Sequence, residues 1–102
     1  MELSLTTDLK GQVAVVTGAS QGLGKAVAIA LGMNGATVVC LARNAQKLAD
    51  TVAEIESSGG SAEAVACDVT DRNAAKAAIE GAKEKHGRLD ILAIMQALPG
   101  IS

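Results

Sequence analysis

Three glycines fall within one short run of the chain, Thr17-Gly18-Ala19-Ser20-Gln21-Gly22-Leu23-Gly24. Their spacing suits the binding of a phosphate group. Gly18 can adopt a backbone conformation that other residues avoid, and so begin a tight turn. Gly22 carries no Cβ, so a phosphate can approach the main chain, and Gly24 lets a following helix pack closely on the preceding strand. Unpaired N–H groups at the start of that helix, together with its dipole, would then attract the anion.

The run can act in this way only if it joins a strand to a helix, and the flanking sequence predicts this. Residues 13–16 are a continuous apolar run, which is typical of a strand buried on both faces of a parallel sheet. Residues 25–33 have the composition of a helix. This context favours a phosphate-binding turn over the alternative, a glycine-rich turn without a ligand.

Strand-like and helix-like patterns continue to alternate along the rest of the chain. One helix carries Leu48, Val52 and Ile55 at spacings of four and three, and another begins at a cap on Thr70 or Asp71. Further strands are predicted at residues 37–42, 64–67 and 89–95. The order β-α-β-α-β-α-β requires parallel strands with crossover helices on the sheet faces. We therefore expect an α/β fold, an open doubly wound parallel sheet in one domain.

The composition argues against several classes of protein. The chain has 102 residues and no Phe, Tyr or Trp, so its core must be aliphatic. A net charge of −2, with no basic stripe and no aromatic rings, argues against nucleic-acid binding. No apolar stretch approaches the roughly 18 residues that cross a bilayer. Residues 1–10 are expected to be a loose lead-in without a secretory signal, which makes the cytoplasm the expected location.

The two cysteines, Cys40 and Cys67, lie in strand-like runs. They have neither metal-site spacing nor the C-x-x-C arrangement of redox motifs. We expect both to be buried, reduced thiols rather than a disulfide, and we expect no metal site.

The pattern T-G-x-x-x-G-x-G resembles the cofactor fingerprint of the short-chain dehydrogenase/reductase family. Residues 9–16 are similar to the family's entry into its first strand, residues 67–71 to its D-V segment, and residues 87–92 to its approach to the fourth strand. The resemblance covers residues 9–93, the first part of a family member. It implies a partial Rossmann-type domain, truncated after the fourth strand, from a relative of 3-oxoacyl-acyl-carrier-protein reductases and glucose or gluconate dehydrogenases.

The resemblance also implies which residues bind the dinucleotide. In the family, the glycine-rich turn holds the diphosphate, and the D-V segment accepts a hydrogen bond from the adenine amino group. Carried over to this chain, the cofactor-binding residues are Gly18, Ser20, Gln21, Gly22, Leu23, Gly24, Arg43, Asn44, Asp68 and Val69. An alternative for Asp68 is a helix cap, and the two roles are compatible.

The end of the second strand discriminates between cofactors. NAD-dependent relatives place an acid there to hold both ribose hydroxyls, whereas this chain has Ala42 followed by Arg43. A guanidinium can pair with a 2′-phosphate through two charge-assisted hydrogen bonds, so NADP(H) is favoured over NAD(H). The alternative for Arg43 is a solvated side chain at a helix start.

The family's catalytic residues have no counterpart in this sequence. Family members carry N-N-A-G, then a serine, then Y-x-x-x-K, in which the tyrosine transfers the substrate's proton. This chain has no tyrosine, and Ser102 has no base near it. We therefore expect no catalytic residue here and no turnover by this chain alone, although the family transfers hydride between a nicotinamide and a carbonyl or alcohol.

The final segment, residues 94–102, suggests an explanation from the genetic code. Met95 is ATG and Gln96 is CA plus a purine, so the shifted triplet between them is GCA, alanine. The neighbouring shifted triplets permit N-N before it and glycine after it. The hypothesis is an out-of-frame tail, the alternative is a divergent C-terminus, and the coding DNA would separate them.

Two other functions remain open. The chain could be a non-catalytic nucleotide-binding or interaction module that pairs with a full-length relative or in a homo-oligomer, or a non-functional truncation product. We further expect weak stability of the isolated chain, since the fourth strand would present an apolar edge.

Overall fold

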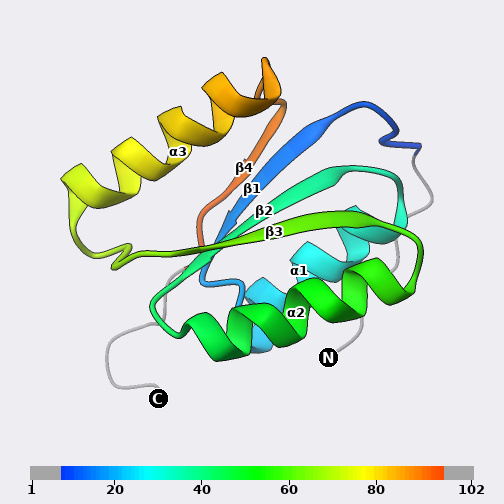
Figure 1. The fold of residues 1–102 in the computed structure, drawn as a ribbon, viewed down its shortest axis with the longest axis horizontal. Coiled ribbons are helices and arrows are strands. Elements are labelled where there is room, and N and C mark those ends of the chain that lie inside the picture. The colour runs from blue at the N-terminus through cyan, green and yellow to red at the C-terminus, as the bar shows by residue number, and fades with distance from the viewer. Residues whose placement is uncertain (1–7, 96–102) are drawn as a thin grey trace.

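The computed structural model describes residues 8–95, which form one β-sheet with helices on both faces (Figure 1). In chain order, the elements are β1 Val13–Thr17, α1 Gly22–Met33, β2 Thr37–Ala42, α2 Ala45–Ser57, β3 Ser61–Ala66, α3 Arg72–His86 and β4 Ile91–Ala93. All strand pairs are parallel, and the strands lie in the order β3-β2-β1-β4. The α/β fold, the element order and the parallel sheet are therefore confirmed.

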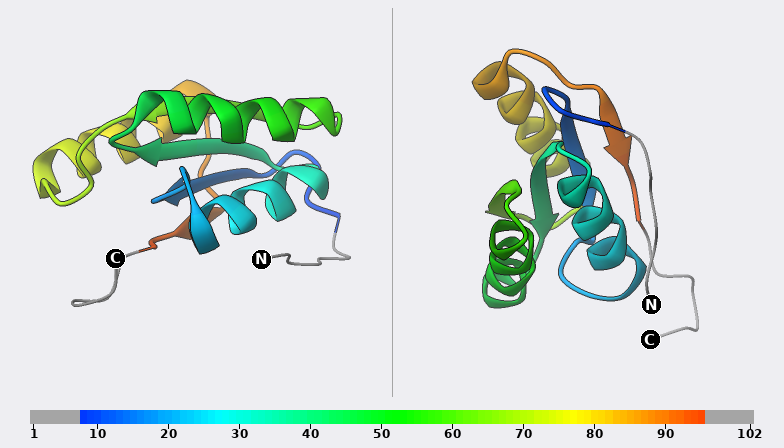
Figure 2. Two further views of the ribbon diagram at one scale, coloured as in Figure 1. Left: turned by 90° about the horizontal axis from the view of Figure 1, so that it is seen from below. Right: turned by 90° about the vertical axis from the view of Figure 1, so that its right-hand side faces the viewer.

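Helices α1 and α2 cover one face of the sheet, and α3 covers the other (Figure 2). The residues of β1 divide between these faces. Ala14 and Val16 pack with α1 and α2, whereas Val15 packs with α3. Every residue of β1 is buried, which explains why this strand is a continuous apolar run rather than an alternating one.

The α1–α2 layer contains most of the core. Leu48 and Ile55 of α2 are fully buried and Val52 is half-buried, as their helical spacing predicts. Gly32 lets α1 approach α2 closely, because a Cβ at this position would lie 2.6 Å from Cγ2 of Ile55. The two helices thus form one compact face.

Helix α3 packs more lightly. Ala82 is the buried residue of this helix, with Ala78 and Ile79 half-buried against the sheet. Polar contacts secure its C-terminal end, where Glu63 of β3 contacts Lys85 Nζ at 2.6 Å and His86 Nε2 at 2.7 Å. Helix α3 is thus held by a small apolar contact with the sheet and by these polar contacts at its C-terminal end.

The third strand and its cysteine differ from expectation. β3 begins at Ser61, because Ser61 pairs with Thr37 of β2, and it ends at Ala66. Cys67 therefore follows the strand and is only half-buried, so the expectation of a buried thiol was wrong there and right for Cys40. Both cysteines are free.

The observed bounds of two other elements also differ from the predicted ones. β4 is limited to Ile91–Ala93, because only these residues pair with β1. Helix α1 begins at Gly22, one turn before the predicted start, so the last glycines of the run belong to the helix itself.

The described part of the expected lead-in is not loose. Leu9 is buried in the core, and its N–H donates to the carbonyl oxygen of Asn34 at 2.7 Å. Residues 1–7 and 96–102, with most of the segment interpreted as an out-of-frame tail, lie outside the described residues. Within residues 8–95, no helix has the length and apolarity that crossing a membrane requires.

Candidate functional site

The glycine-rich run forms the turn between β1 and α1. Gly18 and Gly22 have φ angles of +66° and +59°, in the left-handed region that favours glycine. A Cβ on Gly24 would lie 2.0 Å from the carbonyl oxygen of Gly18, so only glycine lets the helix start this close to the strand. The roles predicted for Gly18 and Gly24 follow from this geometry.

Gly22 has two properties that matter for a ligand. No described atom lies within 4 Å of the position where a Cβ would stand, so the backbone faces open space. Its left-handed conformation is a second reason for glycine here, in addition to the predicted one, the missing side chain. A bulky anion can therefore approach the main chain here.

The first amides of α1 have no acceptor within the described chain. The side chain of Gln21, at the N-cap, makes no capping bond, and the first helical bond is donated by Lys25 N–H to Gln21 O. In contrast, Asn44 caps α2 and Asp71 caps α3 through their side chains. The N–H groups of residues 22–24 are thus free to bind an anion at the positive end of the helix dipole.

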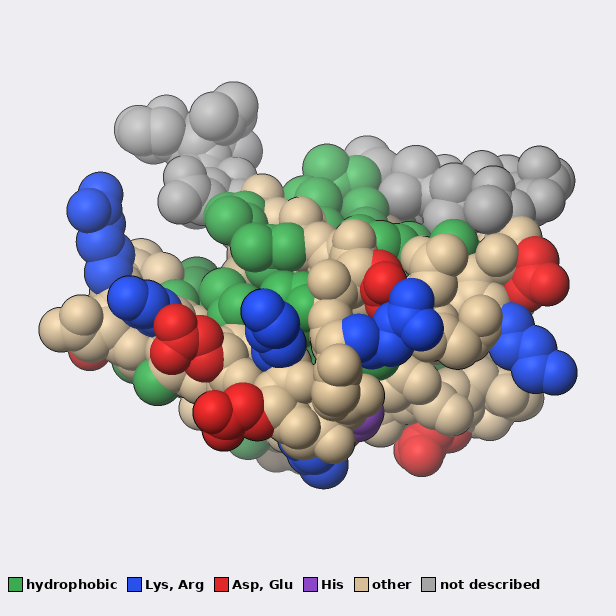
Figure 3. All heavy atoms as spheres, turned by 90° about the horizontal axis from the view of Figure 1, so that it is seen from above, with side chains coloured by type: hydrophobic (Ala, Val, Ile, Leu, Met, Phe, Trp, Pro, Cys, Tyr) green, Lys and Arg blue, Asp and Glu red, His purple; other side chains and the backbone are tan. Residues whose placement is uncertain are grey.

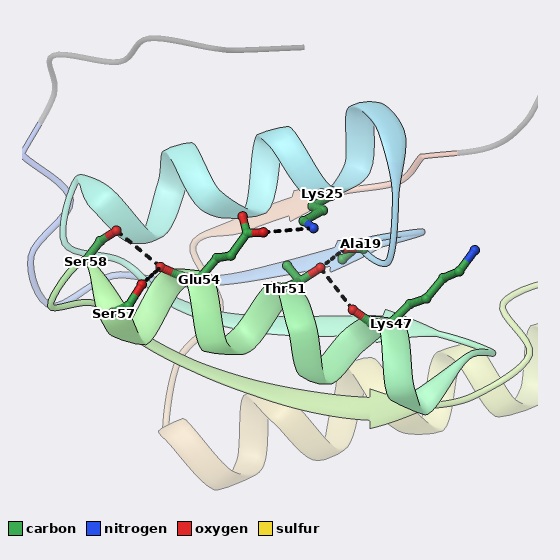
Figure 4. A network of polar contacts seen from close by, with 7 residues as sticks. All are labelled: Ala19, Lys25, Lys47, Thr51, Glu54, Ser57 and Ser58. Carbon is green, nitrogen blue, oxygen red and sulfur yellow. Dashed lines mark hydrogen bonds and ion pairs between the residues drawn. The ribbon is translucent and has the colours of Figure 1, made fainter.

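Two buried contacts hold the turn against the layer beneath it. Ala19 N–H donates to Leu41 O at 3.2 Å, and Thr51 Oγ1 of α2 donates to Ala19 O at 2.9 Å (Figure 4). Thr51 is fully buried. Thr51 was not among the predicted site residues, although a hydroxyl between the apolar residues Leu48 and Ile55 on the buried face of α2 is the signal that points to it.

The turn forms one wall of a groove of about 700 Å³. The other walls come from the end of β2, the start of α2 and the segment after β3. The lining residues are Gly18, Ser20, Gln21, Ala42, Arg43, Asn44, Lys47, Val69, Thr70, Arg72 and Met95. The fold thus gathers, at the carboxyl ends of the strands, segments that are far apart in the sequence.

Most of the predicted site residues line this groove, and the others lie around it. The lining includes Gly18, Ser20, Gln21, Arg43, Asn44 and Val69. Gly22 and Leu23 are exposed at the start of α1, and Gly24 is buried beneath the turn. Gly24 therefore shapes the turn, and the position where its side chain would stand is filled by the backbone of Gly18.

Asp68 lies beside the groove in a tight turn before α3. Its Oδ1 accepts from Thr70 N–H at 2.9 Å and from Thr70 Oγ1 at 2.5 Å. These bonds, with a smaller contribution from the charge of Arg43, hold the pKa of Asp68 below its usual value. The alternative role of Asp68 as a helix cap was wrong, because Asp71 caps α3.

Cationic side chains enter the groove from both walls. Arg43 comes from the segment between β2 and α2, Lys47 from the first turn of α2, and Arg72 is the first residue of α3. Lys47 Nζ donates to Gln21 Oε1 at 2.8 Å, which links α2 to the glycine-rich turn. None of the described residues that line the groove is acidic. Neither Lys47 nor Arg72 was among the predicted site residues.

A second, apolar cleft of about 380 Å³ adjoins the first between α3 and β4. Ile79, Ile94 and Met95 contribute to its lining, and hydrophobic side chains gather on this face of the molecule (Figure 3). Met95 N–H donates to Thr17 Oγ1 at 2.9 Å, which fixes the chain just after β4. The cleft is therefore suited to an apolar group rather than to a phosphate.

Comparisons with known proteins agree with this geometry. The family model for short chain dehydrogenases matches residues 12–97. A 3beta-hydroxysteroid dehydrogenase from Mediterraneibacter gnavus is 41% identical over 91 residues, which cover 89% of this chain and 33% of that protein. The chain thus spans about a third of the length of this curated relative.

Solved structures show the same relationship. A metagenomic short-chain oxidoreductase in complex with NADP has a TM-score of 0.80 and 49% identity, covering 84% of this chain and 39% of the other. A hydroxysteroid dehydrogenase from Escherichia coli has a TM-score of 0.84 and 38% identity, covering 90% of this chain and 39% of the other. With the family model, the relatives and the structures in agreement, this chain belongs to the short-chain dehydrogenase/reductase family.

Proposed function

We propose that this chain is the NADP(H)-binding portion of an oxidoreductase. The observation that carries the proposal is the groove, which is lined by cationic side chains and by no described acid and which reaches Gln21, the residue just before the unpaired amides of α1. A dinucleotide with a phosphorylated ribose is the ligand class that uses both features. The NADP bound to one solved relative supports the same choice.

The residues of the chain divide the binding between them. The amides at the start of α1, with Ser20 and Gln21, hold the diphosphate. Val69 packs against the adenine, and the free carboxylate oxygen of Asp68 accepts from the adenine amino group. When bound, the nicotinamide supplies or accepts the hydride, and the protein orients it and excludes water.

Arg43 selects the phosphorylated ribose in this proposal, with Asn44 beside it. The position where an acid would hold the free ribose hydroxyls is Ala42, and the nearby carboxylate of Asp68 is engaged with Thr70. Arg43 is exposed and so can reorient onto a ligand. A planar guanidinium matches two phosphate oxygens at once.

The parent reaction that we propose is hydride transfer between the nicotinamide and a carbonyl or alcohol. The hydroxysteroid dehydrogenases among the relatives are named for such chemistry. The proton transfer that the family assigns to a tyrosine has no donor here, because the sequence contains none. We therefore propose that this 102-residue chain binds the cofactor without turning over substrate.

We also propose a partner and a location. The partner is a full-length relative or a second copy, positioned at the β4 edge where Leu92 and Ile94 are exposed. The location is the cytoplasm, where reduced thiols such as Cys40 and Cys67 are the norm.

The test is a calorimetric titration of the purified chain with NADPH and with NADH. We expect NADPH to bind more tightly than NADH. Arg43→Ala should lower the ratio of the two affinities about tenfold, since charge-assisted hydrogen bonds to the 2′-phosphate are lost. Equal affinity for the two cofactors would contradict the proposed selectivity. Steady oxidation of NADPH with a carbonyl substrate would contradict the proposed lack of turnover.

A further inference from the structure

Lys47 occupies an electrostatically unfavourable position for a lysine. It lies in the first turn of α2, where its N–H donates to the Asn44 cap at 3.0 Å. The positive end of a helix dipole repels a cation there, and carboxylates are preferred. No acidic residue occupies the first turn of α2 to balance it.

The surroundings of Lys47 add to this cost rather than relieve it. Arg43 lies just before the same helix, and Arg72 begins α3 across the groove, where the carboxylate at the helix start is that of the capping Asp71. The described partner of the Lys47 ammonium is the neutral Gln21 side chain, at 2.8 Å. The groove therefore gathers positive charge without a matching protein anion in its described lining.

We propose that Lys47 is a second specificity-determining residue, whose ammonium pairs with the ribose 2′-phosphate alongside Arg43. The inference rests on the proposed function, because it assigns a ligand atom within the same groove. Gln21 holds Lys47 at the mouth of the groove until the phosphate takes its place. Figure 4 shows the Lys47 side chain projecting away from the start of α2.

The placement favours Lys47 over Arg72 for this contact. The capping bond to Asn44 fixes the Lys47 backbone next to the Arg43–Asn44 segment, at the end of β2. Arg72 comes from the opposite wall with Val69, and it also lines the adjoining apolar cleft. Arg72 thus contributes charge to the groove from the adenine side.

The experiment compares two small probes on the full chain, adenosine 2′,5′-bisphosphate and adenosine 5′-diphosphate. We expect Lys47→Met to weaken the binding of the 2′-phosphorylated probe about tenfold, since one charge-assisted contact is lost. The affinity for adenosine 5′-diphosphate should fall about twofold at most. Lys76→Met is the matched control, because Lys76 lines the apolar cleft and not this groove. Equal behaviour of the two variants would overturn the proposal.

Two further measurements separate the possible failures. Lys47→Arg keeps the positive charge and should retain most of the preference for the 2′-phosphorylated probe. If Lys47→Arg lost as much of this preference as Lys47→Met, ion pairing with the 2′-phosphate would be contradicted. The ligand-free Lys47→Met variant should melt at a higher temperature than the unchanged chain, because a repulsive charge leaves the helix start. If the unchanged chain already lacks a preference for the 2′-phosphate, the proposed function fails, whereas an intact preference in Lys47→Met overturns the role of Lys47 alone.

Discussion

At the scale of single residues, the three glycines of the turn illustrate how one residue type can meet different demands. Gly18 and Gly22 are required for their φ angles, and Gly22 also faces open space. Gly24 has an ordinary helical conformation and is required only for its lack of volume. Substitutions at these positions should therefore fail for different reasons.

Gly24→Ala tests the requirement for volume. The new Cβ would lie 2.0 Å from Gly18 O, a backbone atom that cannot yield without moving the turn. We expect the free energy of unfolding to fall by about 2 kcal/mol or more, with weaker cofactor binding. Urea denaturation measures the first effect and calorimetry the second.

Gly81→Ala is the matched control for that experiment. Gly81 lies within α3, with no described atom within 4 Å of its Cβ position. Alanine should stabilise this helix by about 0.5–1 kcal/mol. If both variants had the same effect, the close approach at Gly24 would have no energetic importance.

Thr51→Val tests whether α2 positions the turn. Valine has nearly the same shape but cannot donate to Ala19 O, so a buried carbonyl loses its partner. We expect a loss of about 1–3 kcal/mol in stability, and weaker cofactor binding. Thr51→Ser keeps the hydroxyl and should preserve binding better, and equal binding by both variants would exclude a positioning role.

Sequence patterns predicted the site residues that act locally and missed those that act across the fold. The glycine spacing and the Arg43 position can be interpreted from their neighbours in the chain. Thr51 contacts a residue 32 positions away, and Lys47 contacts one 26 positions away. Such roles depend on how α2 packs beside α1, which spacing within one helix does not specify.

At the scale of elements, β1 and β2 were predictable because both of their faces are buried. Their apolar runs therefore mark the strands themselves. β3 lies at the sheet edge, and none of its residues is fully buried, so only part of it looked strand-like. The length of β4 is set by how many of its residues pair with β1, and the sequence of β4 alone does not reveal this.

The attachment of α3 should depend on pH through Glu63. Bonds from Lys85 and then His86 lower the pKa of Glu63 below its usual 4.5, so the folded chain holds this carboxylate charged more readily than the unfolded chain does. Its stabilising contribution is therefore complete above 4.5 and is lost as pH falls through the lower, folded value.

Glu63→Gln removes this contribution and provides the test. The variant should be less stable than the unchanged chain at neutral pH, and the difference should shrink as the pH falls below 4.5. Urea denaturation at several pH values measures it, with Glu54→Gln as a comparison on α2. A constant difference across this range would show that Glu63 titrates alike in both states.

At the scale of the whole molecule, the two faces of the sheet are unequally covered. The α1–α2 face contains most of the buried residues, whereas the α3 face has a small cluster and an adjoining apolar cleft of about 380 Å³. Ile94, which lines that cleft, is exposed, and so is Leu92 of β4. Marginal stability is therefore expected of the isolated chain, and cofactor binding should raise it by mass action.

Thiol labelling can measure this coupling, because Cys40 lies at the centre of the sheet. Burial raises the pKa of Cys40 to about 12, so below its ordinary value of 9.0 the native thiol is protonated and reaction must pass through an opened state. In a Cys67→Ser background, NADP at about 100 times its dissociation constant should slow labelling of Cys40 about 100-fold, since it adds about 2.7 kcal/mol. A labelling rate unaffected by NADP would mean that the groove and the core do not open together.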